Sequence, residues 1–403
     1  MHKEIPLEEQ RETSVLLPAA FSNGKWGYIN TEGEVVLEPR FDNAWGFAEG
    51  IAVVRYKGKF GAINQKGEFV IEPKFFELSG PSEGLLIFAR RKDKYGYMNT
   101  GGNVVIKPNF YRAYHFNEGR AFVLLKKYVR TYTFFNPEFF KDPAVPFFSD
   151  YRKFPLKQIR KRRELPMLSR QQETGFIDKE GNLIAKGYFY PPTYLPSSSY
   201  IYYNEGFAAV RIKTFINGEL SQPQGFYINR DGEFAYGPFD DVYPFSEGYA
   251  CVEIDYAHGF INTRGEFVVE PYFGYNPARL RFSNGLLPVL FNVRKRFILS
   301  DTPPDYSENR HQYKWGYLNK KFQVAIYPAF DEVEAFSEGL AAVKIGEKWG
   351  YIDTLGRWII SPRFDEAYEF LDGIAGAILK GIDVYINRQG KIIWPPEDEL
   401  LVN

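Results

Sequence analysis

Residues 349–362 read WGYIDTLGRWIISP, and variants of this stretch return along the whole chain. The first five residues recur as WGYIN at residues 26–30 and as WGYLN at residues 315–319. The step from Gly27 to Gly61 is 34 residues, a period typical of solenoids, propellers and other repeat arrays. The chain is therefore a repeat protein with eight copies of one short unit, and its function is expected on a surface that repetition builds.

The last full copy predicts three short strands. Residues 349–353 and 357–361 are rich in aromatic and β-branched side chains, as strands are. An Asp-Thr-Leu-Gly turn joins them, because Asp can bond the backbone and Gly accepts a positive φ. Pro362 lacks an N–H and is predicted to end the second strand, followed by a bend around a buried Phe364. A second Gly-ended turn and a third strand, residues 374–378, complete the unit.

The same turn glycines and prolines recur in the other copies. Turn glycines stand at Gly33, Gly67, Gly102, Gly181, Gly232, Gly265, Gly356 and Gly390. Prolines that are expected to end strands stand at Pro39, Pro73, Pro108, Pro238, Pro271, Pro328, Pro362 and Pro395. The seventh copy lacks its first turn glycine and has Phe322 in that turn.

A row of acids precedes the second turn glycine, at Glu49, Glu83, Glu118, Glu205, Glu247, Glu338 and Asp372. Two suitably spaced carboxylates could serve a glycosidase. Recurrence in nearly every copy instead favours a structural role, in which the acid binds backbone N–H groups of a turn. No enzymatic role is therefore expected.

These motifs resemble the WG (KWG) β-repeat family of bacterial proteins. The resemblance rests on residues 25–30, 314–319 and 348–353, each with a downstream Pro-x-Phe and acid-Gly-x-Ala-x-Val, and covers roughly residues 14–126 and 175–394. It implies a bacterial source and a binding or scaffolding role. It supplies no catalytic residues.

The expected fold is all-β, an array of about eight to nine three-stranded units in an open β-solenoid or superhelix. The chain starts on a third strand near residues 16–20 and ends on a hairpin at residues 384–395 that no third strand follows. The lone strand and the hairpin could join into a ninth unit and close a propeller-like ring, which is the alternative, or cap an open array. Three strands are few for a propeller blade of four, which favours the open form.

The repeat pattern predicts five segments along the chain. They are an N-terminal tail (1–13), repeats 1–3 (14–126), a basic aromatic insertion (127–174), repeats 4–8 with the terminal half-repeat (175–394) and a C-terminal tail (395–403).

The insertion carries a local charge excess. From Lys126 to Arg170 there are twelve basic and four acidic residues, together with ten aromatics. Interleaved cations and aromatics can contact nucleic acid or an acidic partner. In the alternative interpretation, the aromatics fill a gap in the array and a run of cations is only a solvated face; the run comprises Arg160, Lys161, Arg162 and Arg163.

A Tyr- and Pro-rich loop replaces the usual bend at residues 187–203. Tyrosine is favoured at interfaces because it offers a large rigid area and a hydroxyl. The loop is thus either a long connector or a partner contact, with Tyr188, Tyr190, Tyr194, Tyr200 and Tyr202 as candidates.

Other chemistry finds little support in the sequence. The 50 basic and 50 acidic side chains balance, the four histidines stand at unrelated repeat positions, and the single Cys251 reads as a core residue. Neither ligand spacing for a metal nor a phosphate-binding loop is present, so no metal and no cofactor are expected. The N-terminus lacks a signal-peptide pattern and no run of ~18 apolar residues occurs, which predicts a cytoplasmic protein without a membrane span.

The sequence therefore predicts a non-enzymatic scaffold or binding module for another macromolecule, with a protein as the favoured partner. Two alternatives stay open: glycan or cell-surface binding through exposed aromatics, and nucleic-acid contact through the insertion. Trp26, Trp315 and Trp349 share one repeat position and are expected in the core between neighbouring units.

Overall fold

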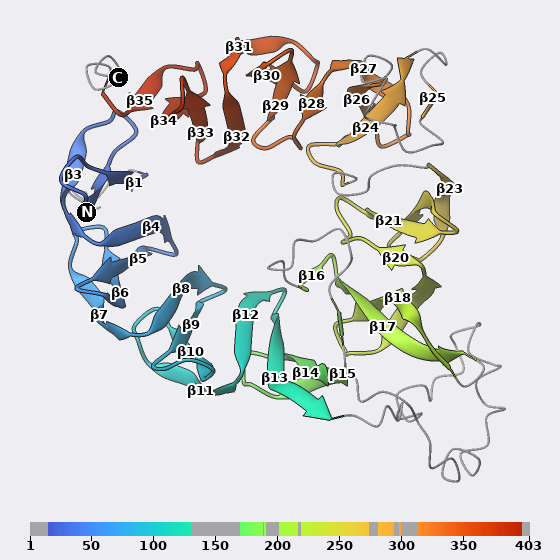
Figure 1. Cartoon of the computed structure of the whole chain (residues 1–403), viewed down its shortest axis with the longest axis horizontal. Helices are drawn as coiled ribbons and strands as arrows, with labels where there is room; N and C mark the ends of the chain where they lie inside the picture. Colours follow the sequence, from blue (N-terminus) through green and yellow to red (C-terminus); the bar gives the residue numbers. More distant parts are fainter. Residues whose placement is uncertain are drawn as a thin grey trace, which may run out of the picture. The chain divides into compact units, whose positions relative to one another are not determined.

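The computed structural model (Figure 1) describes residues 15–130, 170–187, 189–190, 201–216, 219–273, 281–293, 298–299 and 313–396. These residues form nine small antiparallel sheets and no α-helix, so the all-β prediction is confirmed. Eight sheets have four strands and the first has three.

In chain order, the first three sheets comprise β1 (Leu17–Ala20), β2 (Trp26–Ile29) and β3 (Val35–Phe41); β4 (Asn43–Ala48), β5 (Ile51–Tyr56), β6 (Lys59–Asn64) and β7 (Phe69–Phe75); and β8 (Glu77–Ser82), β9 (Leu85–Ala89), β10 (Tyr95–Asn99) and β11 (Val104–Phe110). The next three comprise β12 (Arg112–Asn117), β13 (Arg120–Arg130), β14 (Arg170–Ile177) and β15 (Leu183–Gly187); β16 (Tyr203–Asn204), β17 (Phe207–Ile216), β18 (Glu219–Asn229) and β19 (Phe234–Phe239); and β20 (Asp241–Val242), β21 (Tyr249–Ile254), β22 (Ala257–Asn262) and β23 (Phe267–Phe273). The last three comprise β24 (Leu286–Asn292), β25 (Ile298–Leu299), β26 (Tyr313–Asn319) and β27 (Val324–Phe330); β28 (Glu332–Val333), β29 (Leu340–Ile345), β30 (Lys348–Asp353) and β31 (Trp358–Phe364); and β32 (Glu366–Leu371), β33 (Ile374–Leu379), β34 (Ile382–Asn387) and β35 (Ile392–Trp394).

Seven sheets have the same order, in which the first to fourth strands follow one another in sequence, as in β4-β5-β6-β7. The β24–β27 sheet differs, because β25 lies outside β24 and an isolated bridge between Ser283 and Leu286 stands near the place of a first strand. The β1–β3 sheet has second, third and fourth strands, and the described part of the chain provides no first strand for it. The first strand in the described residues is therefore one that directly precedes a WG hairpin.

The expectation of three strands in each unit is wrong. The segment that the sequence suggests as a bend is the first strand of a sheet, for example β32. This strand pairs with β33 through a shifted register between Ala367 and Phe370, and in three sheets the first strand is only two residues long. A short strand with a bulge does not alternate apolar and polar residues, so periodicity does not reveal it. The buried Phe364 is confirmed, with no exposed surface.

Seven of the eight repeat prolines do not end a strand but lie inside one, and only Pro395 directly follows the end of its strand, β35. β31 runs through Pro362 to Phe364. It is the outer strand of its sheet, so the missing N–H of proline removes no ladder bond. The strand bulges here: Tyr351 pairs with Ile360 while Trp349 pairs with Phe364.

This bulge explains the glycine of the WG motif. A Cβ on Gly350 would lie 2.5 Å from the carbonyl oxygen of Ile360 and 2.7 Å from the nitrogen of Pro362. Backbone at that distance leaves no room for a side chain. Gly61, Gly96 and Gly316 meet their own proline bulges in the same way.

The hairpin turn forms as expected. The side-chain oxygen of Asp353 accepts hydrogen bonds from the amides of Leu355 (3.0 Å) and Arg357 (2.9 Å), and the Gly356 amide donates to the Asp353 carbonyl. In the copy without this glycine, Phe322 takes the positive φ itself, at 57°.

The chain divides into two compact units. Unit 1 contains residues 1–91, 98–103 and 329–403, and unit 2 contains residues 92–97 and 104–328. The core of each unit is a series of aromatic clusters between consecutive sheets, such as Tyr351 against Phe364 and Phe370 in unit 1. Cys251 is fully buried in a cluster of unit 2, as expected.

Within unit 1, the first and last sheets of the chain pack on each other (Figure 1). Ala19 and Ile29 share one apolar cluster with Ile374 and Ile393, and the rings of Phe21 and Trp394 lie 5.0 Å apart. The terminal sheets of an open array would have no such contact, so the open solenoid is wrong and the propeller-like alternative is favoured. The terminal strands nevertheless do not merge into one unit, because β1 pairs with β2 while the β34–β35 hairpin belongs to β33.

Candidate functional site

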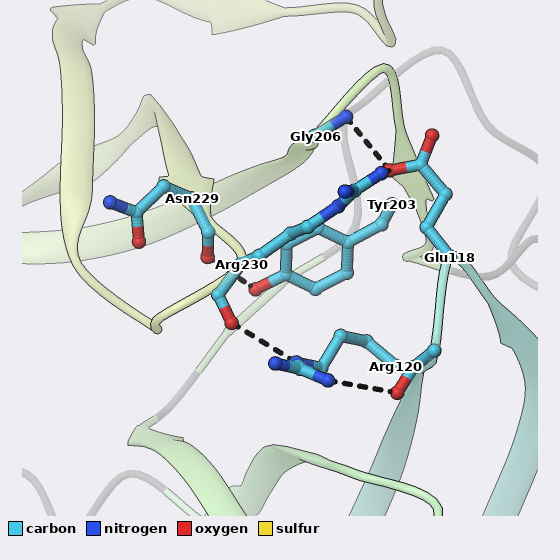
Figure 2. Close-up of polar contacts among 7 residues, drawn as sticks. Glu118, Arg120, Tyr203, Gly206, Asn229 and Arg230 are labelled. Atoms are coloured by element: carbon cyan, nitrogen blue, oxygen red, sulfur yellow. Dashed lines mark hydrogen bonds and ion pairs between the residues drawn. The ribbon is translucent and has the colours of Figure 1, made fainter.

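The recurring acids join neighbouring sheets. In unit 2, a carboxylate oxygen of Glu118 accepts hydrogen bonds from the amide of Gly206 (2.8 Å) and from the side chain of Arg230 (2.9 Å) (Figure 2). Both donors lie in turns of the following sheet, β16–β19. In unit 1, Glu338 accepts from the Gly373 amide at 3.0 Å in the same manner. The predicted bond to backbone N–H groups is confirmed, but the N–H belongs to the following sheet and not to the acid's own turn. We call this contact the Glu–Gly clip.

Arginines extend the clip in Figure 2. Arg120 donates to the Arg230 carbonyl at 3.0 Å and to the Gly119 carbonyl at 3.1 Å, while the Tyr203 hydroxyl donates to the Asn229 carbonyl at 2.8 Å. Burial opposes ionisation of Glu118, but the hydrogen bonds from Arg230 and Gly206 outweigh it, and the pKa of Glu118 is lowered. The carboxylates of these clips are thus occupied in holding sheets together.

Most of the candidate contact residues lie outside the described residues. This holds for Arg160, Lys161, Arg162 and Arg163 of the insertion and for Tyr188, Tyr194 and Tyr200 of the tyrosine loop. Tyr190 and Tyr202 are described, and both are partly exposed.

Tyr190 lies against β17 through its backbone. Its amide donates to the Arg211 carbonyl at 2.8 Å, and the Arg211 amide donates back to the Tyr190 carbonyl at 2.9 Å. The tyrosine loop therefore returns to the sheet at Arg211, whose side chain belongs to a cluster of charged groups.

This polar cluster contains Arg211, Asp241, Glu253 and His258, and it breaks the repeat. Arg211 Nε lies 3.4 Å from Asp241 Oδ1, and His258 Nε2 lies 3.5 Å from Glu253 Oε2. Asp241 on β20 is the direct ladder partner of Glu253 on β21. Asp241 and His258 are only 3% and 5% exposed, and His258 lies where other copies place an apolar ring such as Trp349.

His258 stands where other copies have the tryptophan of the WG motif. It precedes Gly259, whose Cβ would meet the Pro271 bulge at 2.8 Å, as Gly350 meets Pro362. The prediction that the four histidines stand at unrelated repeat positions gave no reason to group His258 with these acids, so this site was not predicted. The available signal was the alignment of His258 with Trp349, one residue before the WG glycine.

Burial shapes the electrostatics of the polar cluster. It raises the pKa of Glu253; His258 and Arg211 oppose the shift, while Asp241 and Asp240 reinforce it. Burial also raises the pKa of the Cys251 thiol, which is therefore not a reactive thiolate. The cluster can hold and release a proton at Glu253, and its contacts join β17 to β20 and β21 to β22.

The part of the chain that the structure describes lacks both a metal-binding group and a membrane-spanning helix. It contains no group of three or more His, Cys, Asp or Glu side chains placed to hold a metal ion. It also contains no helix long and apolar enough to cross a membrane.

The repeat of this chain matches the pattern of a known protein family. The family model described as "WG containing repeat" matches residues 26–60, 60–95, 95–128, 226–256, 259–292, 315–349 and 349–381, which is more than half of the chain. The chain belongs to the WG-repeat family. Six of the seven matches include a glycine that faces a proline bulge, namely Gly27, Gly61, Gly96, Gly259, Gly316 and Gly350. No curated protein matches this WG-repeat chain.

Solved structures resemble this WG-repeat protein only at low sequence identity. A structure described as the eukaryotic initiation factor is 11% identical, with a TM-score of 0.51 and coverage of 94% of this chain and 95% of that chain. BamB from Moraxella catarrhalis is 8% identical, with a TM-score of 0.36 and coverage of 85% and 87%. The β-propeller domain of the Trilobed protease from Pyrococcus furiosus is 9% identical, with a TM-score of 0.34 and coverage of 86% and 94%. The first similarity is one of fold alone.

Proposed function

We propose that this WG-repeat protein is a non-enzymatic scaffold that binds another protein, with the contact centred on Tyr190 and Tyr202 in unit 2. The proposal rests on one observation: the polar residues of the Glu–Gly clips hold sheets together and are not free to bind a partner. The recurring acids engage neighbouring sheets through Glu–Gly clips, as at Glu118 and Glu338, so specificity falls to the places where the repeat is broken.

The broken repeat provides a suitable surface. Tyr190 is paired with β17 through two backbone hydrogen bonds, so its ring is presented from a fixed strand. The ion pair of Arg211 with Asp241 joins the middle of that strand to the β20–β23 sheet. A rigid, partly exposed tyrosine suits a protein interface, because it adds contact area at little entropic cost.

A protein partner is favoured over a glycan. Glycan binding would use exposed aromatic rings, yet Trp315 and Trp349 at the recurring WG position are only 8% and 7% exposed. The repeat therefore places these tryptophans in the core, and they offer no platform for a sugar ring.

The proposal is tested with a double variant, Tyr190→Ala and Tyr202→Ala. Partners are first captured by affinity purification of the parent protein and identified by mass spectrometry, and the same partners are then quantified for the variant. We expect at least tenfold lower recovery with an unchanged melting curve. Tyr327→Ala is the matched control, since Tyr327 is a 70% exposed tyrosine on β27. Equal recovery by parent and double variant would contradict the proposal.

The basic insertion motivates a second arm of the same experiment, because its charge excess suits nucleic acid. For a run of solvated cations, replacing Arg160, Lys161, Arg162 and Arg163 by Ser should leave the melting curve unchanged, since solvated charges contribute little to stability. A nucleic-acid partner would show uptake of labelled single-stranded oligonucleotide that falls steeply with salt and is lost in this variant. Absence of oligonucleotide binding by the parent protein would reject this second function.

A further inference from the structure

The β1–β3 sheet offers a place for one more strand. β1 lies at the edge of its sheet, whereas the equivalent strands β5 and β33 are each covered by a first strand, β4 and β32. The place lies within unit 1, where β1 contacts β4 and its sheet packs on the β32–β35 sheet. The sheets that have a first strand show which aromatic, polar and backbone contacts such a strand makes.

An aromatic pair is incomplete at this place. The tyrosine of the WG motif packs against the first-strand phenylalanine of the following sheet, at 5.0 Å for Tyr28 and Phe47 and at 4.9 Å for Tyr351 and Phe370. Both tyrosines are 0% exposed. Tyr385 holds the same position in the last sheet but is only half-buried, and no aromatic ring in the described residues covers it in this way. Its hydroxyl donates to the Pro18 carbonyl of β1 at 3.2 Å.

The polar contacts are incomplete as well. A clip links Glu49 to Gly84 at 2.9 Å and Glu338 to Gly373 at 3.0 Å. Asp372 is the equivalent acid of the last sheet, and its carboxylate has no hydrogen-bond partner in the described part of the chain. On the other side, the Gly50 amide is equivalent to the Gly84 amide and has no acceptor among the described residues.

The edge of β1 also lacks a backbone donor. The carbonyls of Arg55 and Ile378 each accept a hydrogen bond from the residue that precedes their first strand, Asp42 at 2.7 Å and Asp365 at 2.8 Å. Ala20 is the equivalent of Arg55, because it faces Trp26 as Arg55 faces Phe60. Its carbonyl therefore points toward the edge that a first strand would occupy.

The residues that precede β1 in this sequence do not carry the pattern of a first strand. In the register of the other sheets, the phenylalanine position falls on Glu12 and the glycine position on Val15. A buried glutamate in place of phenylalanine would be strongly unfavourable. Val15 does not have the positive φ that Gly50 and Gly373 adopt in the equivalent turn. Residues 1–15 therefore do not supply the aromatic-x-acid-Gly pattern that fits this place.

We propose that unit 1 binds an extended segment of a partner protein, which adds to β1 as the missing first strand. The aromatic residue of the segment packs on Tyr385, its acid accepts from the Gly50 amide, and its turn presents an N–H to Asp372. Strand addition of this kind takes affinity from backbone hydrogen bonds and specificity from side-chain positions. The site is separate from the tyrosine surface of unit 2, so either proposal can fail alone.

The test uses a strand of this chain as the probe. A fluorescein-labelled peptide of residues 330–339, FDEVEAFSEG, contains the pattern, and a control peptide replaces Phe336 by Ser and Glu338 by Gln. Binding to the full chain is measured by fluorescence anisotropy. We expect saturable binding of the first peptide and at least tenfold weaker binding of the control.

Protein variants locate the site. Ala20→Pro removes the edge N–H of β1, and Tyr385→Ala removes the ring that the peptide covers; each should weaken binding of the first peptide at least tenfold. Glu338→Gln is the matched control: it breaks an occupied clip and should leave peptide binding unchanged while lowering stability. Absence of saturable binding, or equal binding by parent and both site variants, would overturn the proposal. So would tight binding only after removal of residues 1–14, because that result would assign the place to the chain's own N-terminal segment.

Discussion

Single residues in this protein act mainly between sheets. Glu338 has a φ of 51°, in the left-handed region that only glycine enters without strain. The strained turn aims its carboxylate at the Gly373 amide and lets Arg388 donate to the Glu338 carbonyl at 2.9 Å. The residue type is thus set by a contact outside its own turn, which explains why an acid recurs at a position where glycine or asparagine would be less strained.

Trp349→Ala should lower the free energy of unfolding by about 3–5 kcal/mol, because a large side chain with 7% exposure leaves a cavity when it is truncated. Chemical denaturation measures the change. Trp358→Ala is the control, since Trp358 is 39% exposed and its loss should cost under about 1 kcal/mol. Equal effects of the two substitutions would show that the WG tryptophan is not a core residue.

Glu253→Gln should alter the dependence of stability on pH. Burial raises the pKa of Glu253 in the folded state above its ordinary value of 4.5, so the folded state binds this proton more tightly than the unfolded state. The stability that the protonated group provides is complete below about pH 4.5 and is lost as pH rises through the raised pKa. The Gln variant stays neutral, so its stability relative to the parent should increase from pH 4 to pH 7. Urea midpoints at both pH values measure this, and a constant difference would contradict the assignment.

At the scale of elements, the proline bulge and the WG glycine depend on each other, because the bulge needs a residue without a side chain opposite it. The bulge brings the carbonyl of Ile360 over Gly350, and the fourth strand then continues to the buried Phe364. The bulge places Phe364 opposite Trp349 on the neighbouring strand. Two extra residues in an edge strand therefore set the register of the whole hairpin.

Gly350→Ala should destabilise the protein by about 1–3 kcal/mol, because its Cβ would lie 2.5 Å from a backbone carbonyl that cannot move without shifting the strand. Gly376→Ala is the control, since the nearest atom to its Cβ is a side-chain carbon of Tyr368 at 3.4 Å. Its effect should stay within about 1 kcal/mol. Thermal melts compare the two, and a neutral Gly350→Ala would reject the steric explanation of the motif.

The sequence predicted the hairpins and their turns because these depend on local chemistry, as at Asp353 and Gly356. It did not predict the first strands, because a bulged strand such as β32 lacks period-2 alternation. The carboxylate of Glu118 was read as part of its own turn, since nothing local shows that its partner, Gly206, lies 88 positions away. The pairing of Arg211 with Asp241 was missed for the same reason, because the two residues belong to different sheets.

At the scale of the molecule, the contact between the first and last sheets replaces the end caps of an open array. Phe21 packs on Trp394, and Tyr385 bonds to Pro18. An array whose terminal sheets cover each other leaves no apolar sheet face exposed at that place. The aromatic side chains of β34 and β35 therefore depend on residues near the start of the chain.

Deletion of residues 1–24 should lower the melting temperature by more than about 10 °C, because it removes β1 and Phe21 and uncovers the last sheet. Deletion of residues 1–14 alone leaves β1 in place and should change the melt little. A mild effect of the longer deletion would mean that the terminal contact adds no stability. Differential scanning calorimetry of both proteins distinguishes these outcomes.

The direction of the Glu–Gly clips has a consequence for unfolding. Each clip joins a strained backbone in one sheet to an amide of the following sheet, as Glu118 does with Gly206 and Glu205 with Gly248. When a sheet melts, its predecessor keeps the strained turn, worth about 1 kcal/mol, and loses the bond that offsets it. Local melting should therefore spread toward lower residue numbers within a unit, so that the sheets unfold one after another from one side. The near-identical strands alone would not impose this direction.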